Sequence, residues 1–101
     1  MKNNLEIAKN IMNIENLKIN LLGKVYSLFK AFNEDEDGEV LRDNLCDILI
    51  FAYLLGEKLG YDFEEMDEAV IKKLKLQVID KNEGEYNFSG LQRYINSRKR
   101  E

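Results

Sequence analysis

VLRDNLCDILIFAYLLGEKL, residues 40–59, contains the longest apolar run of the chain, the eight residues 48–55. A surface helix carries one apolar stripe, whereas this run is apolar on all sides for two helical turns. It is too short for a membrane span, which needs about 20 apolar residues. We therefore predict a central helix over residues 39–59 that other helices, or a second copy of the chain, cover on every side.

Length and composition limit the class of protein. The chain has 101 residues, enough for a modest core, and we predict a single domain over residues 1–101. Its net charge of −4 gives no general attraction to nucleic acid or anionic lipid, so we expect neither nucleic acid nor a membrane as a partner. Residues 1–10, MKNNLEIAKN, lack the apolar core of a signal peptide, and we expect a cytoplasmic protein.

The chain has one cysteine, Cys46, and no histidine. These counts exclude an intramolecular disulfide, a zinc site built from cysteine and histidine, and a catalytic triad with a histidine base. Any metal would have to be held by carboxylates, which suit magnesium, manganese or calcium. We expect Cys46 to be a small buried core residue, because no base is evident to activate it.

Apolar residues at steps of three and four predict a first long helix over residues 14–32, with Asn13 as its N-cap. Its stripe consists of Ile14, Leu17, Leu21, Val25, Leu28 and Phe32, widened on one side by Leu22, Tyr26 and Phe29. Residues 1–12 are expected to form a short helix or a loosely packed arm. Gly60 is suited to end the central helix in the left-handed conformation.

Two further helices complete the prediction. Asp62 and Glu65 form a capping-box pair before a helix over residues 63–75, and Ser89 is expected to cap a last helix over residues 90–98. The chain has no proline and no alternating strand pattern. The predicted fold class is all-α, an antiparallel bundle of about four helices at residues 14–32, 39–59, 63–75 and 90–98.

The acidic segment NEDEDGE, residues 33–39, allows two interpretations. In a calcium-binding EF-hand loop starting at Asn33, Asp35 and Asp37 would be the third and fifth residues and Gly38 the sixth. The twelfth position, which should supply a bidentate glutamate, is Asn44. A second possible loop begins at Asp80. The interpretation that we favour is an acidic turn that caps a helix starting near Gly38, where the helix dipole stabilises acids.

Three strings carry a family resemblance: LLGKVYSLFKAF at residues 21–32, DNLCDILIFAYLLGEKLGYDF at 43–63 and KLKL at 73–76. Together they resemble the MazG-like family, small relatives of the all-α nucleoside triphosphate pyrophosphohydrolases, over about residues 6–99. The resemblance implies a helical bundle that associates with itself as a homodimer or homotetramer. Enzymes of the wider family cleave nucleoside triphosphates to a monophosphate and pyrophosphate.

The motif of those enzymes consists of two adjacent glutamates and a third three residues later on one helix, then a glutamate three residues before an aspartate on the next. Carboxylates at such spacings share a helix face and hold the cations that neutralise the phosphates. Matched on SLFKAF, the resemblance places Gly23, Lys24 and Ser27 at the three glutamates. Asn44 stands at the fourth glutamate, and Asp47 alone retains its acid.

The resemblance and these substitutions lead to our main functional hypothesis, a nucleotide-binding protein with little or no catalysis that acts by binding or sequestering a nucleotide or a nucleotide signal. The ligand would lie between the first two helices, against Lys18, Lys24, Lys30, Asp43 and Asp47. Lys24 would act as a tethered cation that neutralises Asp47 or a phosphate. Asp43 and Asp47 alone would make at best a weak magnesium site.

Two alternatives remain open. One is an active magnesium-dependent pyrophosphohydrolase with an atypical site around Asp47. The other is a non-catalytic, oligomeric helical interaction module, in which Phe51, Tyr53 and Leu54 of the central helix meet a second copy of the chain.

Overall fold

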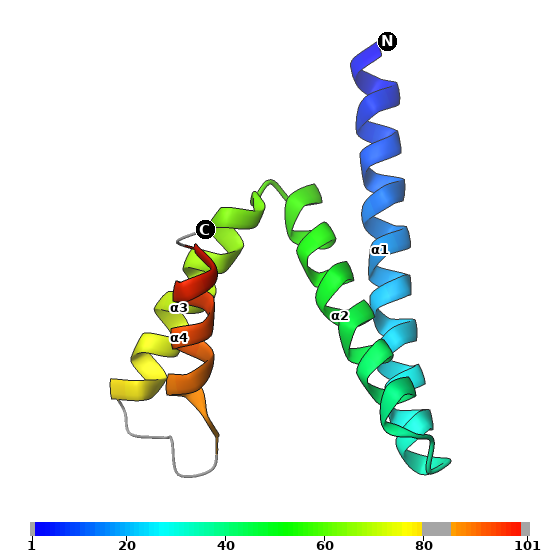
Figure 1. Ribbon diagram of the computed structural model, residues 1–101. Coiled ribbons are helices and arrows are strands. Elements are labelled where there is room, and N and C mark those ends of the chain that lie inside the picture. Colours follow the sequence, from blue (N-terminus) through cyan, green and yellow to red (C-terminus); the bar gives the residue numbers. More distant parts are fainter. Residues whose placement is uncertain (1, 80–85, 100–101) are drawn as a thin grey trace. The chain divides into compact units, whose positions relative to one another are not determined.

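The computed structural model describes residues 2–79 and 86–99, with their side chains at 6–79 and 86–98. The helices are α1 (Lys2–Asn33), α2 (Gly38–Lys58), α3 (Phe63–Ile79) and α4 (Phe88–Lys99). Within the described ranges no residue is in a strand, and the predicted all-α class is confirmed. The chain divides into two compact units, Met1–Tyr61 with α1 and α2, and Asp62–Glu101 with α3 and α4 (Figure 1). The prediction of one domain stays a prediction.

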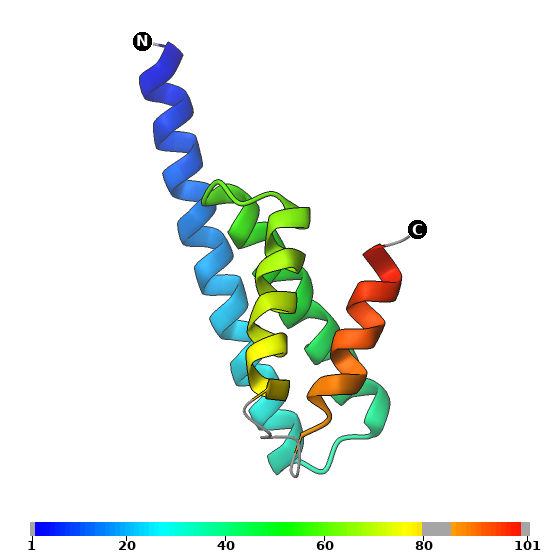
Figure 2. The ribbon, with the colours of Figure 1, turned by 90° about the vertical axis from the view of Figure 1, so that its left-hand side faces the viewer.

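The predicted boundaries are closest for α2 and least accurate for α1. α1 begins at Lys2, so residues 1–12 form neither a separate short helix nor a loose arm where they are described, and Asn13 lies inside the helix instead of capping it. The first turns of α1 extend beyond the end of α2 (Figures 1 and 2). α3 continues to Ile79, four residues beyond its predicted end at residue 75. Most of the second possible calcium loop, from Asp80, lies outside the described residues.

In the first unit α1 packs along α2, and among the described side chains of α1 Leu28 and Ala31 are buried. α2 is less covered than its sequence predicts. Leu49 and Ile50 remain 61% and 53% exposed, and Cys46 is exposed, so the prediction of a buried cysteine is wrong. The reason is that α1 covers one side of α2 only. No helix in the described ranges is long and apolar enough to cross a membrane.

The turn between α1 and α2 is held by backbone and cap interactions. Asp35 takes a left-handed conformation with φ 53°, and the Glu36 N–H donates to the Ala31 carbonyl at 3.0 Å, closing α1. Asp37 is the N-cap of α2: its Oδ1 accepts from the N–H groups of Glu39 and Val40 at 3.1 and 3.2 Å. This geometry supports the interpretation of the acidic segment as a capping turn.

The end of α2 follows the predicted glycine stop. Gly60 has φ 103°, its N–H donates to the Glu57 carbonyl at 3.0 Å, and the Tyr61 N–H donates to the Gly56 carbonyl at 2.9 Å. This pair of bonds is a Schellman motif, which requires a residue that tolerates positive φ.

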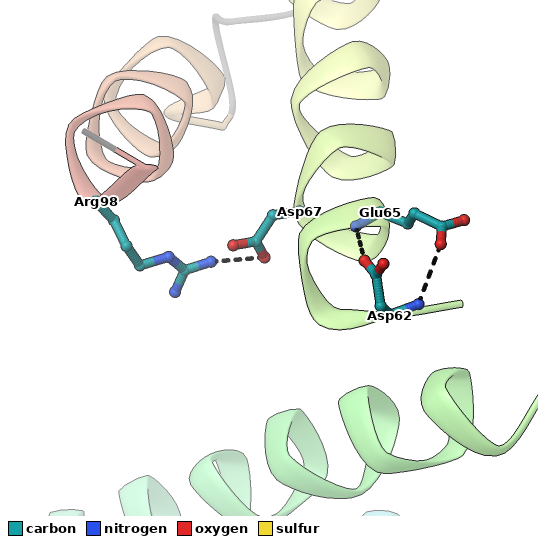
Figure 3. Close-up of polar contacts among 4 residues, drawn as sticks. All are labelled: Asp62, Glu65, Asp67 and Arg98. Atoms are coloured by element: carbon teal, nitrogen blue, oxygen red, sulfur yellow. Dashed lines mark hydrogen bonds and ion pairs between the residues drawn. The ribbon is translucent and has the colours of Figure 1, made fainter. Parts of the chain in front are cut away.

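The second unit is built from α3 and α4 around the buried side chains of Leu74 and Ile95. The predicted capping box is present: the Glu65 N–H donates to Asp62 Oδ1 at 2.8 Å, and the Asp62 N–H donates to Glu65 Oε1 at 3.4 Å (Figure 3). Arg98 of α4 donates to Asp67 Oδ1 of α3 at 2.9 Å in the same view.

The predicted cap of α4 is wrong by two residues. Ser89 lies in the first turn, and Asn87 is the cap, because its Oδ1 accepts from the Gly90 N–H at 3.0 Å. Serine and asparagine are both good N-caps, so local preference cannot choose between these positions.

Candidate functional site

An ion pair joins the two helices of the first unit. It links Lys24, which stands at a substituted position of the enzyme motif, to Asp47, the acid that is retained. Lys24 Nζ of α1 lies 3.2 Å from Asp47 Oδ2 of α2, and the two side chains are 40% and 38% exposed. The expected contact between a tethered lysine and Asp47 is therefore present. The resemblance implies a metal ion as the partner of the aspartate at this position, whereas Asp47 faces the ammonium group of Lys24.

The register of the helix pair shows which other residues of α1 and α2 face each other on either side of the Lys24–Asp47 pair. Because α1 and α2 are antiparallel, residues that face each other have numbers with a constant sum, which is 71 for Lys24 and Asp47. Ser27 and Asn44 share this sum, and both line a hollow of about 200 Å³ with Lys30. All four of these motif positions thus lie along one edge of the helix pair, which we call the α1·α2 edge.

Toward the other end of the α1·α2 edge lies a second hollow, of about 220 Å³. Leu17 and Leu54 line it, and their residue numbers again sum to 71. Its other lining residues are Asn13, Asn16, Glu57 and Lys58. The apolar pattern of the sequence does not predict this hollow. The only related signal is a set of asparagines at positions 13, 16 and 20, which follow the helical spacing of three and four and lie on the same side of α1 as Lys24.

Two of the five predicted ligand-binding residues, Lys18 and Asp43, do not take part in the Lys24–Asp47 contact. Lys18 is six residues from Lys24, which leaves it about 120° away around α1, and its Nζ pairs with Glu15 at 3.0 Å. Asp43 is exposed, one turn before Asp47, and forms no ion pair within the described part of the chain. Lys30 lines the smaller hollow, and its Nζ is 3.9 Å from Glu34 Oε1.

The predicted interface residues Phe51, Tyr53 and Leu54 are each half-buried. Leu54 lines the larger hollow of the α1·α2 edge. Among the described side chains of the first unit, the apolar ones that are at least 61% exposed are mostly on α1. They are Leu49 of α2 and, on α1, Met12, Ile19, Leu22, Tyr26 and Phe29, between 61% and 71% exposed. Leu22, Tyr26 and Phe29 therefore do not widen the stripe that faces α2, as the sequence suggested, but belong to a second stripe.

The residues of the α1·α2 edge do not fit the magnesium ion that the enzyme motif serves. A site for this ion uses carboxylates and water. The motif positions of this edge offer the Ser27 hydroxyl, the Asn44 amide and the Asp47 carboxylate, which already faces an ammonium group. The other carboxylates, Glu34 and Glu36 at the smaller hollow and Glu57 at the larger one, are not motif positions. The Asn44 amide also donates to the Val40 carbonyl at 3.2 Å. Among the described side chains, no three of cysteine, aspartate or glutamate lie close enough to hold a metal.

The chain matches the MazG-like family over residues 7–91. Searches of curated proteins and of solved structures gave no significant match. The family match covers both helices of the α1·α2 edge from Ile7 onward. The chain belongs to the MazG-like family, which relates it to the nucleotide pyrophosphohydrolases.

Proposed function

We propose that this protein binds a nucleotide, or a nucleotide-derived signal, at the α1·α2 edge and does not hydrolyse it. The observation that carries the proposal is the Lys24–Asp47 ion pair at 3.2 Å, in which Lys24 stands where the resemblance implies a metal-binding glutamate. A phosphate group and Asp47 are alternative anionic partners for the same ammonium group. Both partners of the pair are more than one-third exposed, so an incoming phosphate can reach Lys24.

We propose that hydrolysis is lost because the α1·α2 edge lacks the groups that hydrolysis needs. Pyrophosphate release requires cations that neutralise the phosphates and activate a water molecule. A lysine supplies one positive charge and three hydrogen-bond donors, but it cannot lower the pKa of a bound water as a metal ion does. The expected outcome of binding is sequestration of the ligand.

Calorimetric titration tests this proposal. The ligands are nucleoside triphosphates, cyclic nucleotides and adenosine diphosphate ribose, each with magnesium and with a chelator. We expect at least one to bind in both conditions, more weakly to Lys24→Gln and normally to Lys73→Gln, a charge-matched change on α3. Binding of none of these ligands would contradict the proposal. Magnesium-dependent release of pyrophosphate that disappears in Asp47→Ala would support the active enzyme instead.

Self-association is a second candidate property, favoured by the exposed stripe of α1 that comprises Met12, Ile19, Leu22, Tyr26 and Phe29. Met12, Ile19 and Tyr26 are seven residues apart, as are Leu22 and Phe29, which is the spacing of a helix-to-helix seam. With side chains of about 150–200 Å², the stripe exposes roughly 500–650 Å² per copy, so two copies would bury roughly 1,000–1,300 Å², enough for a specific interface. The proposed occupant is a second copy of the chain.

Sedimentation of matched variants tests this interface. Leu22 is 71% exposed, so Leu22→Glu leaves the folded unit intact and should yield monomers, whereas Leu91→Glu on α4 should not. An oligomer that survives Leu22→Glu but dissociates in Phe51→Glu would assign the interface to Phe51, Tyr53 and Leu54. A wild-type chain that is monomeric at all concentrations would contradict self-association.

A further inference from the structure

The larger hollow of the α1·α2 edge lies in line with the Lys24–Asp47 pair. Leu17 precedes Lys24 by seven residues and Leu54 follows Asp47 by seven, so both helices separate the hollow from the pair by two turns. Two turns correspond to about 10 Å along the helix axes, and seven residues return almost to the same side of each helix. The hollow and the ammonium group therefore face the same side, a nucleotide's length apart.

The lining of this hollow suits a flat ring with polar edges. Leu17 and Leu54 supply apolar surface, and the exposed part of the lining is mainly apolar. The amides of Asn13 and Asn16 offer both donors and acceptors, and the carboxylate of Glu57 offers acceptors only. A nucleobase combines an apolar face with donors and acceptors in one plane, and asparagine side chains pair with base edges in this way.

The size of the hollow limits what it can hold. At about 220 Å³ it is smaller than the roughly 300–1,000 Å³ of pockets that enclose a whole drug-sized ligand. It can thus take one ring system, while the rest of the ligand extends along the edge.

The asparagines of α1 do not stabilise the helix. The three asparagines at positions 13, 16 and 20 have poor helix propensity relative to alanine, so the helix itself gains nothing from them.

We propose that the hollow between Leu17 and Leu54 is the base subsite of the nucleotide whose phosphates reach Lys24. This inference rests on the proposed nucleotide binding and adds the place and chemistry of base recognition. The ligand class is a nucleoside di- or triphosphate in an extended conformation, bound through its base and its terminal phosphates.

The test compares nucleotides with a ligand that has no base. Wild type and variants are titrated in the presence of a chelator with ATP, GTP, CTP and UTP, and with inorganic tripolyphosphate. Leu54→Trp fills the hollow, and Asn16→Ala removes an exposed amide without affecting folding. Both should weaken the preferred nucleotide by about tenfold, the effect of losing one good contact, and leave tripolyphosphate unchanged. Lys24→Gln should weaken both ligands, and Leu49→Trp, a change outside the hollow, should weaken neither.

The outcomes separate this inference from the proposed function. If Lys24→Gln weakens nucleotide binding while Leu54→Trp and Asn16→Ala do not, the base subsite is wrong and the proposed function stands. Equal affinity of wild type for tripolyphosphate and for every nucleotide also overturns the base subsite. If no nucleotide binds, both proposals are wrong.

Discussion

At the scale of single residues, the Lys24–Asp47 pair contributes little to folding because both side chains are partly exposed to water. Exposed ion pairs of this kind stabilise a fold by about 0–1 kcal/mol. In a double-mutant cycle of Lys24→Gln and Asp47→Asn, we expect a coupling below about 1 kcal/mol in the free energy of unfolding by urea. A coupling of about 3 kcal/mol would instead mean that the pair exists to hold the helices together.

A single residue also closes each helix of the first unit. Asp35 at φ 53° carries a side chain where glycine is preferred, so Asp35→Gly should raise the free energy of unfolding by about 0.5–1 kcal/mol. Gly60 at φ 103° is already a glycine, and Gly60→Ala should lower it by about 1–2 kcal/mol. Gly23→Ala is the control. Gly23 is exposed in the middle of a helix with open space around it, so this change should raise the free energy of unfolding by about 1 kcal/mol. Destabilisation by Asp35→Gly would refute this account of the turn.

At the scale of the elements, the facing positions of α1 and α2 can be tested by restoring the carboxylates. The combined variant Gly23→Glu, Lys24→Glu, Ser27→Glu and Asn44→Glu places four new acids beside Asp47. We expect it to bind magnesium in calorimetry, since carboxylates from two adjacent helices then surround one point. The same variant with Asp47→Asn should bind magnesium more weakly. Absence of magnesium binding would contradict the alignment of the edge with the enzyme motif.

The helices also show which structural features can be predicted from the sequence. Helix ends were predicted correctly where the signal is local, as for Gly60 and for the Asp62–Glu65 box. α1 was harder because it is apolar on two sides. Periodicity detects both stripes, but it does not say that Leu22 and Tyr26 are exposed while Leu28 faces α2. The Lys24–Asp47 contact followed from the motif, whereas the Leu17–Leu54 hollow depends on a gap between side chains that no pattern reveals.

At the scale of the whole molecule, the chain belongs to the MazG-like family. The positions at which the resemblance places the metal-binding glutamates of related enzymes carry Gly23, Lys24, Ser27 and Asn44. The apolar run of α2 predicted cover on all sides, and within the first unit α1 provides cover on one side. We propose that Lys24 binds phosphate in the role that a metal ion has in related enzymes, so that binding does not need magnesium.

Titration of wild type and Lys24→Gln with nucleoside triphosphates in a chelating buffer is the most direct test of that claim. We expect the wild type to bind without magnesium and to release no pyrophosphate, and we expect Lys24→Gln to lose at least about tenfold in affinity. Binding that requires magnesium and is unchanged in Lys24→Gln would contradict it.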